Sequence, residues 1–124
     1  MATVTPTLTI TSSDALVDTL SLSVNDSLEV LGQSQYGKKQ TTASLAVLFA
    51  SGSFNTSYVF LKNLSPSDIS RGTDGIVVAF GSNEELALGP GEFAFFPWDG
   101  GTNLQVKHNG TGVAPFCEFA IFEF

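Results

Sequence analysis

The sequence predicts an all-β protein: an antiparallel β-sandwich, jelly-roll-like, with an extended N-terminal arm or hairpin. Polar and apolar residues alternate with a period of two along most of the chain, as they do in strands that bury one face. These short runs recur about every ten residues between turns rich in Gly, Asn and Asp, a spacing typical of sandwiches and jelly rolls. No stretch of the sequence shows a sustained helical period.

The N-terminal segment contains three short alternating runs. Thr alternates with apolar residues in 7–11, and Thr and Ser do so in 19–24. Residues 27–31 keep the same parity. The sequence therefore allows either one long strand over 19–31 or a hairpin that turns at Asn25-Asp26.

The next segment is polar and then apolar. Residues 32–40 contain two glycines and are predicted to form a loop. Within this loop, the Lys38-Lys39 pair is either solvated or docks on an acidic partner surface. Residues 42–50 carry apolar residues on both faces and fit a buried strand at least as well as a short helix.

Further strands are predicted towards the C-terminus, after a turn-rich connection at 65–75. Asn109-Gly110 lies between the last two runs and is the strongest hairpin signal in the chain, because both residues tolerate positive φ. The predicted strands are 57–64, 76–81, 85–89, 92–98, 103–108 and 113–124.

Aromatic residues divide the chain into two parts. Residues 1–35 contain no aromatic residue, whereas 36–124 contain every Phe, Tyr and Trp of the chain. We therefore expect 36–124 to form a self-sufficient β-sandwich core and 1–35 to form an arm or peripheral hairpin that leans on another surface.

Residues 92–98 are apolar on both sides. On a strand, Phe93 and Phe95 point to one side, and Phe96 and Trp98 point to the other. Only one side of such a strand can enter the core of a two-layer sandwich. The aromatic residues either fill a thick interior, form a subunit interface or, at Trp98, provide a platform on which a sugar stacks.

The final strand, 113–124, is also apolar on both sides. Two such strands exceed what one small core needs, so we hypothesise that the surplus apolar surface forms the interface of a homo-oligomer. The residues expected at an interface with other subunits or with another protein are Leu8, Ile10, Leu20, Leu22, Lys38, Lys39, Phe96, Trp98, Phe122 and Phe124.

The charge pattern disfavours polyanionic partners. The formal net charge is −7, and charged residues are 14% of the chain, below the usual share of about 25%. Apart from Lys38-Lys39, the basic residues are scattered. We therefore expect neither nucleic acid nor an anionic membrane surface as a direct partner.

Side chains capable of catalysis are few. His108 is the single histidine, and no nucleophile motif accompanies it. Cys117 is the single cysteine, which we expect to act as a small apolar side chain. We therefore expect a protein without enzymatic activity, cofactor or metal.

Four carboxylates are concentrated near predicted turns: Glu84, Glu85, Glu92 and Asp99. We interpret them as solvated turn charges, with a calcium site between loops as the alternative. The N-terminus lacks the basic and continuous apolar parts of a signal peptide, so we expect the chain to fold in a cytosol. No run approaches the ~20 apolar residues of a membrane span.

Three segments together resemble a known class of proteins: MATVTPTLTITSSDALVDTLSLSV, YVFLKNLSPSD and LALGPGEFAFFPWDG. They are similar to small virion structural proteins of tailed bacteriophages. In those proteins, strands of the types Y-V-x-L-K-N and L-x-P-G-E-F-x-F-x-P recur in β-sandwich modules. The resemblance covers most of the chain and includes no catalytic motif.

The resemblance implies a capsid decoration (cement) protein, commonly a homotrimer, that stabilises the shell. It would be made in the host cytoplasm and located in the virion. Its partner would be the major capsid protein or another virion protein. The alternatives are a tail or fibre adaptor and a carbohydrate-binding host-recognition module that uses Trp98.

Overall fold

A computed structural model describes residues 2–65, 75–110 and 113–124 of the chain. These ranges contain antiparallel strands and no helix, which confirms the predicted all-β class. The chain divides into two compact units, which we name the arm (Met1–Leu31) and the body (Gly32–Phe124). This division lies close to the boundary expected after residue 35.

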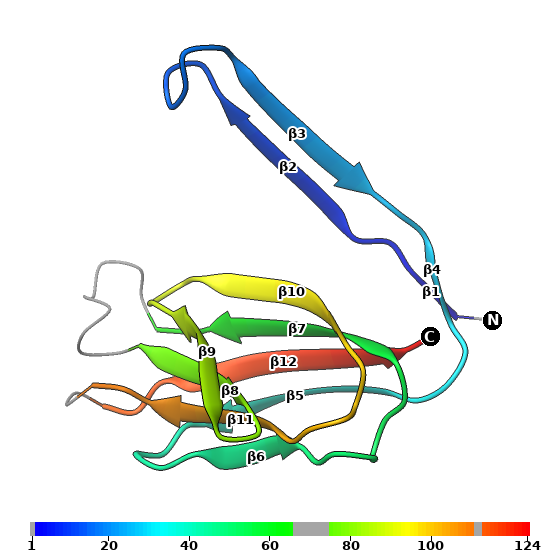
Figure 1. Cartoon of the computed structure of the whole chain (residues 1–124), viewed down its shortest axis with the longest axis vertical. Coiled ribbons are helices and arrows are strands. Elements are labelled where there is room, and N and C mark those ends of the chain that lie inside the picture. The colour runs from blue at the N-terminus through cyan, green and yellow to red at the C-terminus, as the bar shows by residue number, and fades with distance from the viewer. Residues whose placement is uncertain (1, 66–74, 111–112) are drawn as a thin grey trace. The chain divides into compact units, whose positions relative to one another are not determined.

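The arm is a two-stranded antiparallel ribbon (Figure 1). Its first strand consists of β1 (Ala2–Val4) and β2 (Thr7–Ser12), and its second consists of β3 (Leu20–Asn25) and β4 (Leu28–Val30). β2 pairs with β3, and β1 pairs with β4. The ribbon therefore includes β1, which the sequence pattern did not predict.

Both ladders of the arm share one register. The β2–β3 ladder ends where Thr7 lies opposite Asn25. The next backbone hydrogen bond runs from the Asp26 N–H to the Pro6 carbonyl oxygen (3.3 Å). Beyond it, the β1–β4 ladder continues in the same register. The chain thus reverses at 13–19 and not at Asn25-Asp26, so β3 and β4 are one interrupted strand.

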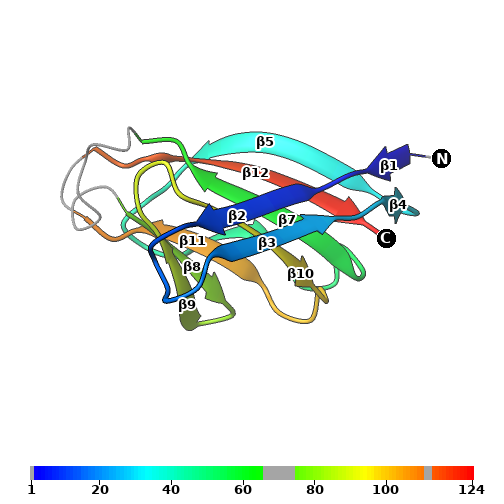
Figure 2. The same cartoon turned by 90° about the horizontal axis from the view of Figure 1, so that it is seen from above.

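The body is a jelly roll of two four-stranded sheets. One sheet has the strand order β10-β7-β12-β5, and the other has the order β6-β11-β8-β9. Successive strands lie in different sheets, except that β8 and β9 are paired neighbours. Figure 2 shows β5, β12 and β7 side by side in the first sheet. The described strands of the body are β5 (Ser34–Gln40), β6 (Ala46–Phe49), β7 (Ser57–Asn63), β8 (Ile76–Phe80), β9 (Asn83–Leu88), β10 (Phe93–Trp98), β11 (Leu104–His108) and β12 (Phe116–Glu123).

The core lies between the two sheets. Val59 and Leu61 of β7 and Ile121 of β12 are fully buried, and they belong to one cluster with Val78 and Val106 of the opposite sheet. These β-branched and aliphatic side chains alternate along their strands with residues of the outer side, as the period of two predicts.

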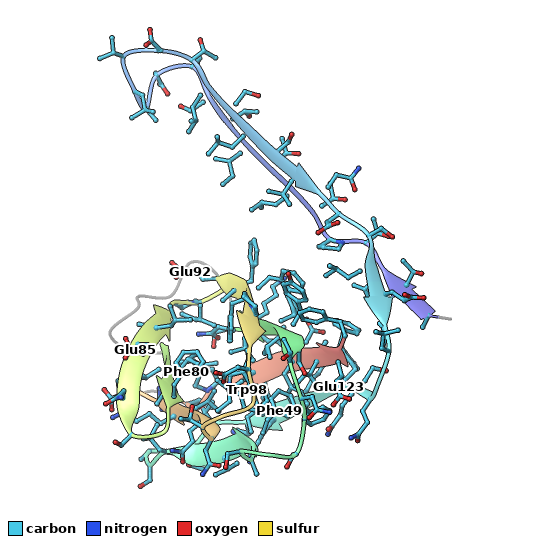
Figure 3. All side chains as sticks on the ribbon, turned by 45° about the vertical axis from the view of Figure 1, so that its right-hand side comes forward. Phe49, Phe80, Glu85, Glu92, Trp98 and Glu123 are labelled. Atoms are coloured by element: carbon cyan, nitrogen blue, oxygen red, sulfur yellow. The ribbon has the colours of Figure 1, made fainter. Side chains whose placement is uncertain are left out.

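Aromatic rings complete this core around Phe49. Its ring centroid lies 5.5 Å from those of Phe54 and Phe119 and 6.1 Å from that of Trp98. Figure 3 shows Phe49, Phe80 and Trp98 inside the body. Part of the aromatic surplus in the sequence therefore fills the interior.

The prediction of a loop at 32–40 is wrong, because β5 occupies most of this segment. Among the described strands, β5 lies at one edge of its sheet and has β12 as its neighbour. Lys and Gln suit an edge strand because they discourage pairing with further chains. Gly37 is required there, since a Cβ at this position would lie 2.8 Å from the Phe119 ring.

The hairpin predicted at Asn109-Gly110 is also wrong. β11 and β12 belong to different sheets, so the connection between them crosses from one layer to the other. An Asn-Gly pair permits a tight turn, but burial of both strands in a shared core decides which strands pair. The remaining predicted strands are present with shifted ends, but 42–50 contains the short edge strand β6 with Val47 exposed, and not the expected buried strand. Most of the connection predicted at 65–75 lies outside the described residues.

Candidate assembly interface

The outer side of the β10-β7-β12-β5 sheet carries aromatic side chains. In β7, Val59 and Leu61 point into the core, so Tyr58 and Phe60 point outward. The β7–β10 ladder places Phe95 opposite Phe60. We name a neighbouring group of these outward residues, from β7, β10 and the C-terminal end of the chain, the aromatic face: Tyr58, Phe60, Phe93, Phe95, Phe122 and Phe124.

Most rings of the aromatic face lie close to one another, and three of them, Phe93, Phe95 and Phe124, are exposed. The Tyr58 ring lies 5.2 Å from that of Phe95 and 4.7 Å from that of Phe124, both in stacked geometry. The rings of Phe60 and Phe93 are 6.4 Å apart, yet 56% of Phe93 is exposed. Contiguous exposed aromatic residues of this kind are typical of interaction sites.

Polar side chains border the aromatic face. Glu118 of β12 lies opposite Lys62 of β7 and opposite Lys38 of β5. The Tyr36 hydroxyl donates a hydrogen bond to the Glu118 carboxylate, and this bond raises the pKa of the Tyr36 phenol. The border therefore holds two ammonium groups and one carboxylate that is already hydrogen-bonded.

The arm carries a second apolar surface. Its register places Leu8 opposite Val24 and Ile10 opposite Leu22, and 44% of both Leu8 and Ile10 is exposed. Residues of the opposite parity are Thr, Ser, Asn and Glu, so they form a polar side. The apolar residues that share one side, which we name the apolar ribbon face, are Ala2, Val4, Pro6, Leu8, Ile10, Leu20, Leu22, Val24, Leu28 and Val30.

The structure brings several predicted interface residues onto these two surfaces. Leu8, Ile10, Leu20 and Leu22 lie in the apolar ribbon face, and they remain interface candidates. Phe122 and Phe124 lie in the aromatic face, and they remain candidates as well.

The predicted Lys38-Lys39 pair is split by β5, because successive residues of a strand point to opposite sides. Lys38 lies at the border of the aromatic face. Lys39 points the other way, and its Nζ donates to the Val47 carbonyl oxygen at 3.2 Å. The two lysines therefore do not present one joint surface to a partner.

Trp98 belongs to the core, and Phe96 packs against it partly buried, which corrects the expectation of an interface position for these two residues. Only 4% of Trp98 is exposed, and the Phe96 ring meets that of Phe80 edge to face at 5.6 Å. The outward residues of β10 are instead Phe93, Phe95 and Pro97, none of which was among the predicted interface residues.

The sequence contains a signal for which side of β10 points outward. Lys62 shares its side of β7 with Tyr58 and Phe60, and a lysine rarely points into a core. The ladder sets Phe93 opposite Lys62 and Phe95 opposite Phe60, so these residues share the outer side. The pairing of β7 with β10 was the missing information.

Cys117 and His108 have structural positions. Cys117 is fully buried among the core residues, and burial raises the pKa of its thiol to about 11. This burial confirms the expectation of a small apolar side chain. His108 ends β11 and is buried, and its backbone N–H donates to the Thr42 carbonyl oxygen at 2.8 Å.

The carboxylates at the turns bind backbone or side-chain groups close by. Glu92 accepts the Gly89 N–H at 3.0 Å, and Asp99 accepts the Gly101 N–H at 2.8 Å. Glu84 forms an ion pair with Lys107. Within the described ranges, no three His, Cys, Asp or Glu residues are grouped closely enough to hold a metal ion. The described part also contains no helix long and apolar enough to cross a membrane.

Comparison with known proteins identifies no family. No model of a protein family and no curated protein matches the sequence. Among solved structures, the chain is similar to one from the Bacillus endospore appendages, which are described as a novel family of disulfide-linked pili. The two chains are 14% identical, the similarity covers 74% of this chain and 86% of the appendage chain, and the TM-score is 0.47.

Proposed function

We propose that this protein is a non-enzymatic structural subunit of a bacteriophage virion. In this role it acts as a capsid decoration protein that strengthens the shell as a homo-oligomer, and we favour a trimer. The aromatic face carries this proposal, because a rigid jelly roll that leaves neighbouring aromatic rings in water gains stability when another protein surface covers them.

The position of the aromatic face also supports a structural role. Tyr58, Phe60 and Phe122 lie on strands that are hydrogen-bonded on both sides, β7 and β12, and Phe93 and Phe95 lie on the neighbouring strand β10. A surface built on paired strands changes shape little on binding, so it can transmit load between neighbouring subunits. The resemblance to small virion proteins supports the proposal that the protein is part of a phage particle.

Carbohydrate recognition loses its main support. That alternative depended on Trp98 as a stacking platform, and the Trp98 ring lies in the core beside Phe49. A sugar cannot stack on a ring that other side chains cover. We therefore do not propose a host-recognition module.

The test combines purified particles with a binding assay. Mass spectrometry of separated capsids and tails is expected to find the protein with the capsids. The purified protein is expected to be oligomeric and to co-sediment with capsids that lack it. Detection in the tail fraction would instead indicate the adaptor, and a strict monomer that binds neither part would contradict a structural role.

A matched pair of variants tests the surface itself. Phe93→Asp places a charge in the aromatic face, and Glu85→Lys changes a charge on the exposed edge strand β9. Co-sedimentation with capsids is expected to be lost in the first variant and retained in the second. Equal binding by both variants would contradict the assignment of the aromatic face.

A further inference from the structure

The arm cannot bury its apolar side by its own folding. It is a two-stranded ribbon, and two strands provide one layer without a second layer to cover it. Two-stranded hairpins are at best marginally stable in water without a packing partner. The apolar ribbon face therefore calls for an apolar surface that lies outside the ribbon.

We propose that the apolar ribbon face of one copy packs against the aromatic face of a second copy of this chain. The inference rests on the proposed function only in requiring more than one copy in the assembly. Every copy carries both surfaces, so each subunit donates its arm to one neighbour and accepts the arm of another.

The two surfaces match in chemistry. The ribbon presents aliphatic side chains such as Ile10 and Leu22, and the sheet presents flat rings such as Phe93 and Phe95. Aliphatic side chains fill the spaces between rings when one sheet packs face to face on another. The result is a third layer on the open side of the jelly roll.

The surfaces also match in size. The ribbon runs over residues 2–12 and 20–30, about 35 Å of strand, whereas the eight residues of β12 span about 26 Å. The ribbon therefore covers the whole length of the aromatic face, and its remaining end stays joined to the body that donates it.

Charge favours the same pairing. The arm contains the carboxylates Asp14, Asp18, Asp26 and Glu29 and no Lys or Arg. The border of the aromatic face carries Lys38 and Lys62, and its Glu118 is hydrogen-bonded to Tyr36. An anionic arm is thus directed to the surface of the body that displays ammonium groups.

Each subunit takes part in two such contacts, one through its own arm and one through the arm that it accepts. Because the contact joins two different surfaces, it either closes into a ring or extends as a filament.

Isotope-resolved photo-cross-linking tests this contact without assuming how the ribbon is aligned on the sheet. Leu22→p-benzoylphenylalanine places the photoreactive group in the apolar ribbon face, and Ser23→p-benzoylphenylalanine places it on the polar side, one residue away. Each full-length variant is labelled with ¹⁵N and co-refolded with the unlabelled chain. The near-ultraviolet fluorescence of buried Trp98 verifies that the body is folded.

The proposal predicts cross-links from position 22 to peptides of β7, β10 and β12, formed between labelled and unlabelled chains. Position 23 is expected to lose these products. Cross-links confined to a single isotope would show that the arm folds onto its own body, and they would overturn the proposal. Products in the second sheet or in another arm would overturn it as well.

The result is read together with sizing of the same samples. An oligomer without these cross-links overturns the arm contact and leaves the proposed structural function standing. A monomer that binds no capsid overturns both. Leu22→Asp provides a second measure: the proposal predicts a dissociation constant raised at least about tenfold, whereas Ser23→Asp leaves it unchanged. Equal dissociation constants for the two variants would also overturn it.

Discussion

At the scale of single residues, Gly100 is fixed by its surroundings. Its φ is +75°, and a Cβ on it would lie 2.2 Å from the Phe54 carbonyl oxygen. Its own carbonyl oxygen accepts the Gly52 N–H at 3.0 Å, so the loop cannot move away freely. Gly52 also has a positive φ of +79°, but a Cβ there meets nothing within 4 Å.

This contrast gives a prediction for two matched variants. We expect Gly100→Ala to lower the free energy of unfolding by at least about 2 kcal/mol, because backbone strain and a backbone clash add together. Gly52→Ala retains only the conformational strain and is expected to cost about 1 kcal/mol. Urea unfolding followed by Trp98 fluorescence measures both values. Equal losses would show that the contact at Phe54 does not restrict the loop.

Cys117 makes stability depend on alkaline pH. Burial raises the pKa of its thiol from 9.0 to about 11, so the unfolded chain loses this proton at a lower pH than the folded chain. Rising pH therefore favours the unfolded state. Between about pH 8 and pH 10, we expect the free energy of unfolding to fall by about 1 kcal/mol from this group alone.

Comparison with Cys117→Ala isolates that contribution, since the variant retains every other group that titrates. Its unfolding free energy is expected to fall less over the same pH interval, although its stability at neutral pH is lower because a cavity remains. Urea titrations of both proteins at each pH provide the measurement. Parallel pH profiles would contradict the raised thiol pKa.

At the scale of strands, the two sides of the β10-β7-β12-β5 sheet differ: one side packs in the core, and the other side is exposed. Phe119 points into the core and contacts Phe49 edge to face. Phe93 points outward and is largely exposed. The same residue type therefore holds the fold together on one side and remains available for contact on the other.

Truncation of these two phenylalanines distinguishes core packing from surface exposure by its effect on stability. Phe119→Ala is expected to lower the free energy of unfolding by about 3–5 kcal/mol, whereas Phe93→Ala is expected to cost less than about 1 kcal/mol. Unfolding is measured in urea on dilute samples, where assembly contributes least. A large cost for Phe93→Ala under these conditions would mean that the aromatic face belongs to the core of the single chain.

The strands also show how far sequence alone could lead. Alternation correctly predicted most strands and the two sides of 92–98, because side-chain direction along a strand has a fixed period. It could not tell which side enters the core, since that depends on pairing between β7 and β10, which are distant in sequence. β5 was missed because an edge strand needs no apolar side chains.

The arm was predicted only in part, because alternation shows which residues share a side but not which strands pair. The common parity of 19–24 and 27–31 was visible in the sequence, and both segments do belong to one strand. The chain reversal at 13–19 was not predicted. It depends on a register that links residues far apart, whereas Asn25-Asp26 offers only a local turn signal.

At the scale of the whole molecule, the body has one complete core, and each of the two units carries an apolar surface that it does not bury by its own folding. The jelly roll buries its inner aromatic and aliphatic residues without help from the arm's sequence. Phe93 of the aromatic face and Leu8 and Ile10 of the apolar ribbon face are exposed. In the proposed assembly, contact between copies removes both surfaces from water, and this hydrophobic gain is the basis of the proposed structural function.

Sedimentation velocity of the full-length protein over a wide concentration range tests this central claim most directly. We expect one closed oligomer, with monomer appearing only on strong dilution. A protein that sediments as a monomer at every concentration would contradict the account, because the two apolar surfaces would then be stable in water without a partner.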